Sequence, residues 1–132
     1  MEIKQFIPDG QYFDVLIAKS VNPSIKLDSS DIAFIKGCNE VTVFELTKDS
    51  PSEDTDAFVD NFLMEVKNRV DGESPDHVLL YIGAESAQLP MDTMMSINAF
   101  CEIFPKKSEV RYGLYQNEGN NPLHIVIAIG KG

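Results

Sequence analysis

Residues 77–82 read HVLLYI and form a nearly continuous apolar run. A run of this kind is typical of a β-strand that is covered on both faces or placed centrally in a sheet. Further along the chain, residues 123–129 read LHIVIAI and are almost as apolar. The two runs predict two strands of one sheet.

Two more strands and two helices are predicted around this pair. Residues 41–46 (VTVFEL) are rich in β-branched and aromatic side chains, and residues 109–115 (EVRYGLY) alternate in polarity, so both segments predict strands. Residues 50–72 carry an apolar stripe at helical spacing, and a second helix is expected from Pro90 to about residue 104. Each helix therefore connects one predicted strand to the next.

The last two strands are joined by residues 116–122, a short link rich in turn-forming residues, which favours an antiparallel hairpin. The order of elements is then β-α-β-α-β-β after an N-terminal segment. This order predicts an α+β fold with two layers, in which two helices pack on one face of a four-stranded mixed sheet. Four side chains are expected toward the other, open face of the sheet: Tyr81, Arg111, Tyr115 and His124.

Residues 1–27 form an N-terminal segment whose structure the pattern leaves open. Residues 11–20 have a roughly helical apolar period, but residues 13–17 fit a strand equally well. We therefore divide the chain into this segment and a domain that spans residues 28–132. The total length of 132 residues fits one domain and leaves little room for two.

Composition narrows the range of partners and locations. The net charge of −10 argues against nucleic acid and anionic membrane surfaces, because phosphate groups are bound by basic faces. The first residues, MEIKQ, lack a signal-peptide pattern, and no apolar run approaches the about 20 residues that span a bilayer. Cys38 and Cys101 have neither CxxC nor metal-ligand spacing. These features predict a cytoplasmic protein with no membrane insertion and with reduced, buried cysteines.

Four segments share a pattern with a known family: residues 78–84 (VLLYIGA), 91–94 (MDTM), 110–113 (VRYG) and 125–130 (IVIAIG). They resemble the C-terminal domain of FtsZ, the bacterial relative of tubulin. That domain has an apolar strand leading into a loop, a helix beginning with a Leu-Asp-like pair, a strand ending in glycine, and a closing Val-x-Val-Ile-Ala-Thr-Gly pattern. Ile129 stands where the family has threonine, and the resemblance covers roughly residues 38–130.

The resemblance extends upstream to residues 25–32, which read IKLDSSDI. FtsZ carries a loop reading Asn-x-Asp-x-x-Asp before its C-terminal domain, and the two aspartates reach into the nucleotide pocket of the neighbouring subunit. Asp28 and Asp31 match this acidic pair in spacing, and Lys26 replaces the asparagine. The resemblance implies that these three residues form an interaction surface. The residues alone also fit a plain helix N-terminus, capped by Asp28 or Ser29.

No motif for catalysis or for phosphate binding accompanies this resemblance. The eight glycines are scattered, and no GxGxxG or P-loop pattern occurs. Neither a GxSxG elbow nor a zinc motif is present. We therefore expect no GTP hydrolysis, no cofactor and no bound metal, and predict that the chain is not an enzyme.

The predicted function is a non-catalytic protein-interaction or self-association module that resembles the FtsZ C-terminal domain. Its partner would be a second copy or an FtsZ-like protein, whose filament assembly in cell division it would modulate. The alternative is a small-molecule binding protein or enzyme with a site at a seam between subunits. An anionic ligand would then be held by Arg111, with Tyr115, Glu45 and His124 around it, because arginine grips a carboxylate bidentately. Glu45 and Arg111 are also expected to meet on the open face of the sheet.

Two further groups of residues are given structural roles. His77 and His124 fall on strands and are expected as ordinary strand or rim residues, close together if their strands are neighbours. Met91, Met94 and Met95 are expected in the core, with an adaptable docking surface as the alternative.

Overall fold

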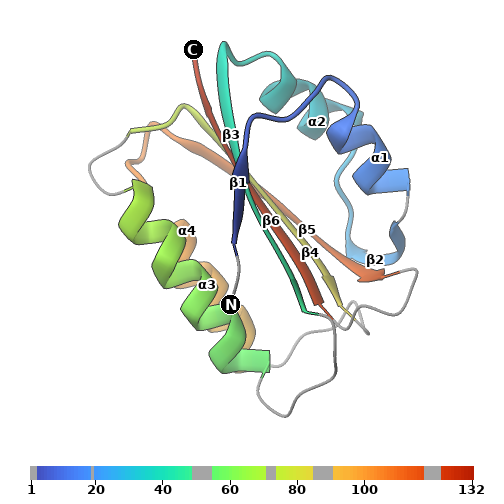
Figure 1. Cartoon of the computed structure of the whole chain (residues 1–132), viewed down its shortest axis with the longest axis vertical. Helices are drawn as coiled ribbons and strands as arrows, with labels where there is room; N and C mark the ends of the chain where they lie inside the picture. The colour runs from blue at the N-terminus through green and yellow to red at the C-terminus, as the bar shows by residue number, and fades with distance from the viewer. Residues whose placement is uncertain (1–2, 19, 49–54, 71–73, 85–90, 118–122) are drawn as a thin grey trace.

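The computed structural model describes residues 3–18, 20–48, 55–70, 74–84, 91–117 and 123–132. Helices and strands alternate through most of these residues (Figure 1). In chain order the described elements are β1 (Lys4–Phe6), α1 (Tyr12–Ala18), β2 (Ser20–Ile25), α2 (Ser29–Lys36), β3 (Glu40–Lys48), α3 (Thr55–Val70), β4 (His77–Ala84), α4 (Met91–Cys101), β5 (Glu109–Asn117) and β6 (Leu123–Lys131). The predicted start of the first long helix at residue 50 lies outside the described residues.

All the described strands join one mixed sheet, in the order β1-β3-β6-β4-β5-β2. β4 and β5 run parallel, and every other neighbouring pair is antiparallel. β4 and β6, which contain the two apolar runs of the sequence, are the central strands. Figure 1 shows α3 and α4 on one side of this sheet and α1 and α2 on the other.

The predicted α+β class with a mixed sheet is confirmed, but two details of the prediction are wrong. The sheet has six described strands instead of four, because β1 and β2 add one strand at each edge. Its second face is not open, because α1 and α2 cover it. The reason is that β4 is apolar on both faces, so Leu79 and Tyr81 need a cover just as Leu80 does.

The N-terminal residues contribute to this second layer. Residues 12–18 form α1, so the helical reading of this region is correct and the strand reading is wrong. Phe13 and Leu16 are its buried residues, and they pack on the sheet with residues of α2. Residues 3–18 and 20–27 thus contribute to the same sheet and core as the rest of the described chain.

The predicted hairpin between the last two strands is also wrong. β6 pairs with β3 and β4, while β5 pairs with β4 and β2, so β4 lies between them. The physical reason is burial. β6 is buried over residues 125–130 and is stabilised by a central place, whereas β5 carries Glu109 and Arg111, which are better solvated nearer an edge.

Two apolar clusters fill the two interfaces between sheet and helices. The cluster beneath α3 and α4 is built from aliphatic and phenylalanine side chains, with Phe62, Leu80 and Ile127 fully buried. The cluster beneath α1 and α2 includes Tyr81 and Tyr115. Because successive strand residues point to opposite faces, each central strand contributes side chains to both clusters.

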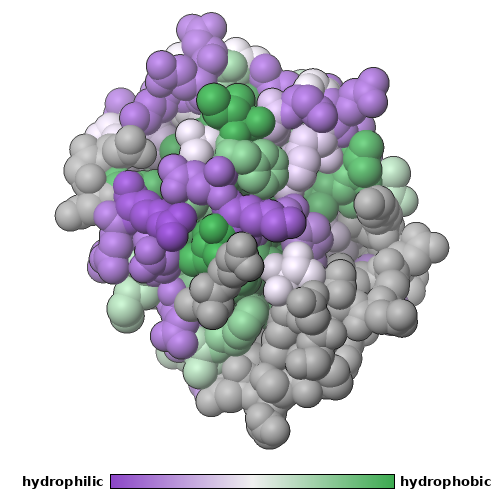
Figure 2. Space-filling view, in the orientation of Figure 1, coloured by the Kyte–Doolittle hydropathy of each residue, from purple (hydrophilic) through white to green (hydrophobic). Residues whose placement is uncertain are grey.

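On the face of the molecule drawn in Figure 2, the apolar residues, in green, form separate small areas among hydrophilic ones. Met91 and Met95 are 75% and 61% exposed, so the prediction that they pack in the core is wrong, while Met94 does pack against it. Among the described residues, no helix is both long enough and apolar enough to cross a bilayer.

Candidate functional site

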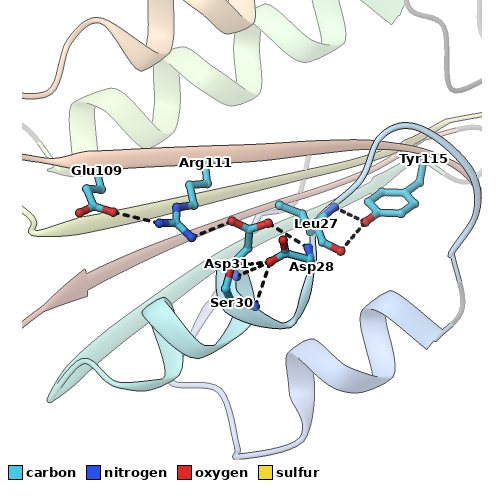
Figure 3. Close-up of polar contacts among 7 residues, drawn as sticks. All are labelled: Leu27, Asp28, Ser30, Asp31, Glu109, Arg111 and Tyr115. Atoms are coloured by element: carbon cyan, nitrogen blue, oxygen red, sulfur yellow. Dashed lines mark hydrogen bonds and ion pairs between the residues drawn. The ribbon is translucent and has the colours of Figure 1, made fainter.

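The candidate site is the turn formed by residues 26–31, called here the acidic turn, which leads into α2. Asp28 is the N-cap of α2, and its Oδ1 accepts hydrogen bonds from the backbone N–H of Ser30 and Asp31 at 2.9 and 3.0 Å. The Oδ2 atom of Asp31 accepts from the N–H of Asp28 at 2.9 Å, which completes a capping box. These reciprocal bonds hold the turn in one conformation (Figure 3).

β5 anchors the acidic turn from beneath through Tyr115. The N–H of Leu27 donates to the Tyr115 hydroxyl at 2.6 Å, and that hydroxyl donates to the Leu27 carbonyl at 3.4 Å. Leu27 itself lies over Gly113, where an added Cβ would come within 2.7 Å of Leu27 Cγ and 2.8 Å of the Tyr115 ring. Glycine at 113 therefore makes room for the side chain that seats the turn on the strand.

Arg111 forms a second anchor on the same strand. Its Nη1 contacts Asp31 Oδ1 at 2.8 Å, and its Nη2 contacts Glu109 Oε2 at 3.3 Å (Figure 3). The guanidinium carbon lies 4.4 Å from the centre of the Phe34 ring on α2, a cation–π contact. Two carboxylates and one aromatic ring thus hold the Arg111 guanidinium in place beside the start of α2.

The pKa shifts favour an ionised Asp28 in the turn and a neutral Tyr115 beneath it. The Ser30 hydroxyl and the neighbouring backbone N–H groups hold the pKa of the exposed Asp28 carboxyl below its ordinary value. Burial, reinforced by the nearby Asp31 and Asp28 carboxylates, raises the pKa of Tyr115. At neutral pH the turn therefore presents an ionised Asp28, while Tyr115 keeps the proton that it donates to the Leu27 carbonyl.

An open groove of about 930 Å³ begins at the acidic turn and runs between α1 and α2. Lys36 of α2 and Asp14 of α1 bridge the two helices with a 3.1 Å ion pair between exposed side chains. The lining residues combine charged side chains with apolar ones: Asp14, Ile17, Ala18, Lys26, Leu27, Asp28, Ser29, Ile32, Ala33, Lys36 and Gly37. The turn and the groove form one continuous surface feature.

A separate polar cluster lies beneath α1. The Tyr12 hydroxyl donates to Glu45 Oε2 at 2.6 Å, and His124 Nε2 lies 3.0 Å from the same oxygen. The His124 ring also packs edge-on against Tyr81. The bond from His124, together with the one from Tyr12, holds the pKa of Glu45 below its ordinary value, while burial and the Glu45 carboxylate raise the pKa of Tyr12.

The structure groups the predicted site residues differently from the sequence. Arg111 and Tyr115, for which the alternative prediction is a ligand, contact the acidic turn through Asp31 and Leu27. Glu45 and Arg111 do not pair with each other, because β6 and β4 lie between their strands, and each contacts other partners. Lys26 and Asp28 are exposed, and the helix-capping role that the residues alone allowed for Asp28 is confirmed.

The two histidines lie on neighbouring strands but near opposite ends. His77 is opposite Gly130, whereas His124 is opposite Gly83. The Nδ1 atom of His77 is buried and has no hydrogen-bond partner among the described residues. Within the part of the chain that the structure describes, no three His, Cys, Asp or Glu side chains lie close enough together to hold a metal ion.

Sequence reasoning missed the contributions of α1 and of Phe34 to this region. Tyr12 and Asp14 belong to a segment whose secondary structure was left open, so its faces could not be assigned. The aromatic position of Phe34, six residues after Asp28, was the available signal for a ring above Arg111. A comparison with protein-family models finds no match, and a comparison with curated proteins finds no significant match.

Proposed function

We propose that the chain is a non-catalytic protein-interaction module whose contact surface is the acidic turn and the adjoining groove. One observation carries the proposal: an exposed, ionised turn is anchored from beneath by buried or half-buried side chains of β5. Tyr115 is 3% exposed and serves the turn through Leu27, and Arg111 serves it through Asp31. Such support lowers the entropy that the turn would lose on binding a partner.

The chemistry of the surface favours a protein partner. Asp28 offers a fixed negative charge at a helix start, and Lys26 offers an exposed positive charge two residues before it. Ile17, Ile32 and Leu27 give the groove an apolar floor. Charged rims around a small apolar centre are the usual anatomy of a protein–protein interface, and the net charge of −10 disfavours nucleic acid.

The resemblance to the C-terminal domain of FtsZ suggests the kind of partner. In FtsZ the acidic pair before this domain approaches the neighbouring subunit, and the domain contributes half of the longitudinal contact. For this chain we propose the contact between subunits and not GTP hydrolysis, since the chain carries no glycine-rich phosphate loop and Lys26 replaces the asparagine. The proposed partner is therefore an FtsZ-like protein in the cytoplasm, whose filament end the acidic turn would meet.

The test is a sedimentation and light-scattering assay of purified bacterial FtsZ with GTP, with and without this chain. We expect the wild-type chain to reduce or slow filament assembly in proportion to its concentration. Asp28→Asn is the informative variant, because asparagine caps a helix as well as aspartate does but removes the charge. It should need about tenfold more protein for the same effect, equivalent to about 1.4 kcal/mol.

Asp60→Asn on α3 is the matched control, because it removes one exposed carboxylate from the other side of the molecule. If Asp28→Asn and Asp60→Asn behave alike, the acidic turn is not the contact surface. If the wild-type chain leaves FtsZ assembly unchanged at every concentration, the proposed partner is wrong.

A further inference from the structure

The outer edge of β5 is unpaired over its first half. β2 pairs with β5 only over residues 114–117, and no described strand lies beside residues 109–113 on that side. This leaves a free strand edge next to the site described above, in a segment that belongs to the same ordered sheet.

The direction of the backbone groups at this edge follows from one hydrogen bond. The N–H of Glu109 donates to the Asp76 carbonyl at 2.9 Å, on the side of β4. Because these directions alternate along a strand, the N–H and C=O groups of Val110 and Tyr112 point away from β4. Both residues thus present hydrogen-bonding groups to whatever approaches the edge.

The other two edges of the sheet are protected against such pairing. β1 has only three residues, one of which is Lys4. β2 contains Pro23, and its register shifts between Val21 and Ile25. Short length, lysine, proline and bulges are the usual devices that keep strand edges apart. Residues 109–113, EVRYG, contain neither lysine nor proline.

We infer that this edge pairs with the same edge of a second copy of the chain, antiparallel, about a two-fold axis through Val110. In this register Glu109 of each copy lies opposite Arg111 of the other, so two opposite-charge pairs form. A register shifted by two residues would instead place Arg111 opposite Arg111 of the second copy, which like-charge repulsion disfavours. The charge pattern of the edge therefore selects one self-complementary register, as a two-fold interface requires.

The side chains at this edge are available for the interface. Those of Glu109 and Arg111 are 57% and 37% exposed on the face that carries α2. On the opposite face, Val110 and Tyr112 are half-buried and already pack against the apolar cluster beneath α3 and α4. In the dimer Val110 would lie opposite Val110 of the second copy, and Tyr112 would lie on the same face opposite Ser108. This arrangement brings the two apolar clusters together across one continuous sheet.

This dimer is tested separately from the proposed function, because it uses the β5 edge and not the exposed side chains of the acidic turn. Arg111 is shared, since it also holds Asp31, so the separation depends on variants at other positions. Asp28→Asn leaves all edge residues intact, and Glu109→Arg leaves the capping box intact. Failure of one inference is therefore distinguishable from failure of the other.

The test is sedimentation equilibrium of the full chain from micromolar to millimolar concentration. We expect a concentration-dependent dimer. Glu109→Arg and Arg111→Glu each create two like-charge pairs and should each weaken the dimer about tenfold or more. An equimolar mixture of the two variants should dimerise again, because every cross-strand pair is then Arg with Glu. Glu102→Arg, an equal charge change at an exposed position beyond α4, should have no effect.

A second measurement does not depend on charge. Val110→Cys places two thiols across the axis, with Cα atoms about 5.5 Å apart in a hydrogen-bonded antiparallel pair, which a disulfide can span. A mild oxidant should crosslink this variant and leave the wild type, with Cys38 and Cys101, uncrosslinked. A monomer throughout the series, a dimer indifferent to Glu109→Arg, or an absence of crosslinking would each overturn the inference. If Arg111→Glu fails to fold, the dimer is tested by comparing the dimerisation of Glu109→Arg with that of its control, Glu102→Arg.

Discussion

The two faces of the sheet are covered by different kinds of chemistry. Beneath α3 and α4 the cluster consists of aliphatic and phenylalanine side chains, and Phe62, Val66 and Ile97 are fully buried. Beneath α1 and α2, apolar side chains share the face with Tyr115 and with the cluster around Glu45, which use hydrogen bonds. Both faces bury the sheet, and among the described residues the α1–α2 face uses the buried Tyr115 side chain to position a loop.

This difference separates the bulk of the apolar packing from the positioning of the acidic turn within one small domain. Apolar packing gains free energy from any well-fitted shape, so the α3–α4 face requires little from individual polar atoms. Hydrogen bonds add little net stability but impose distance and direction. The α1–α2 face therefore determines where the acidic turn lies, and the α3–α4 face keeps the domain folded.

Phe62→Ala should cause the largest loss of stability. The Phe62 side chain is fully buried in the α3–α4 cluster, and such truncations cost about 3–5 kcal/mol. Urea unfolding followed by circular dichroism measures the change. Met64→Ala, two residues on and 62% exposed, is the control and should stay within about 0.5 kcal/mol of wild type. If Phe62→Ala lowers the free energy of unfolding as little as the control does, the α3–α4 cluster is not the main source of stability.

Gly113→Ala should be the next largest change and should act on the α1–α2 face. The new Cβ would meet Leu27 Cγ at 2.7 Å, so Leu27 must move and the acidic turn with it. Overpacking of this kind costs about 1–3 kcal/mol. Amide hydrogen exchange should speed up in α2 more than in α3. Gly10→Ala, whose Cβ would meet nothing within 4 Å, is the matched control, and equal effects of the two changes would argue against a seated turn.

Tyr115→Phe tests the hydrogen bond separately from the packing. The Leu27 N–H would lose its partner in a site where Leu27 is 3% exposed, which should cost about 1 kcal/mol, the lower end for an unsatisfied buried group. Urea unfolding gives the loss, and NMR shifts of residues 26–31 show whether it is local. Tyr112→Phe on the opposite face of β5 is the control. Shifts spread evenly over the whole chain would contradict an anchoring role.

Glu45→Gln should have the smallest effect, visible as a change in pH dependence. The folded-state pKa of Glu45 lies below its ordinary value of 4.5, so the carboxylate contributes stability above that pH. This contribution is lost as the pH falls through the lowered folded-state pKa. The difference in unfolding free energy between wild type and Glu45→Gln should therefore shrink below pH 4.5. The same change at exposed Glu102 is the control, and a gap that widens in acid would reverse the assignment.

Much of the fold was predictable from local pattern. The apolar runs of β4 and β6 predicted two strands, and the helical stripe around Phe62 predicted α3. The partner of β5 was not predictable in this way. Residues 116–122 read as a hairpin link, but pairing depends on which strands need burial on both faces, and that competition involves the whole sheet.

In the candidate site, too, the local contacts were predictable from the sequence and the contacts between distant residues were not. The cap at Asp28 and its reciprocal bond to Asp31 follow from residues three apart, so the sequence alone allowed them. The anchors do not, because Arg111 lies 80 positions from Asp31 and Tyr115 lies 88 from Leu27. No local rule links residues at such separations.

By itself, the sequence determined the class of the fold and the two apolar strands, and it allowed a helix start capped by Asp28 or Ser29. Each of these depends on side-chain periodicity or capping within a few residues, which the chain carries wherever it folds. Only the tertiary structure decided that α1 and α2 close the second face, that β4 separates β5 from β6, and that Arg111 pairs with Asp31. These outcomes depend on how distant segments share burial and charge, a balance that exists only once the sheet is assembled.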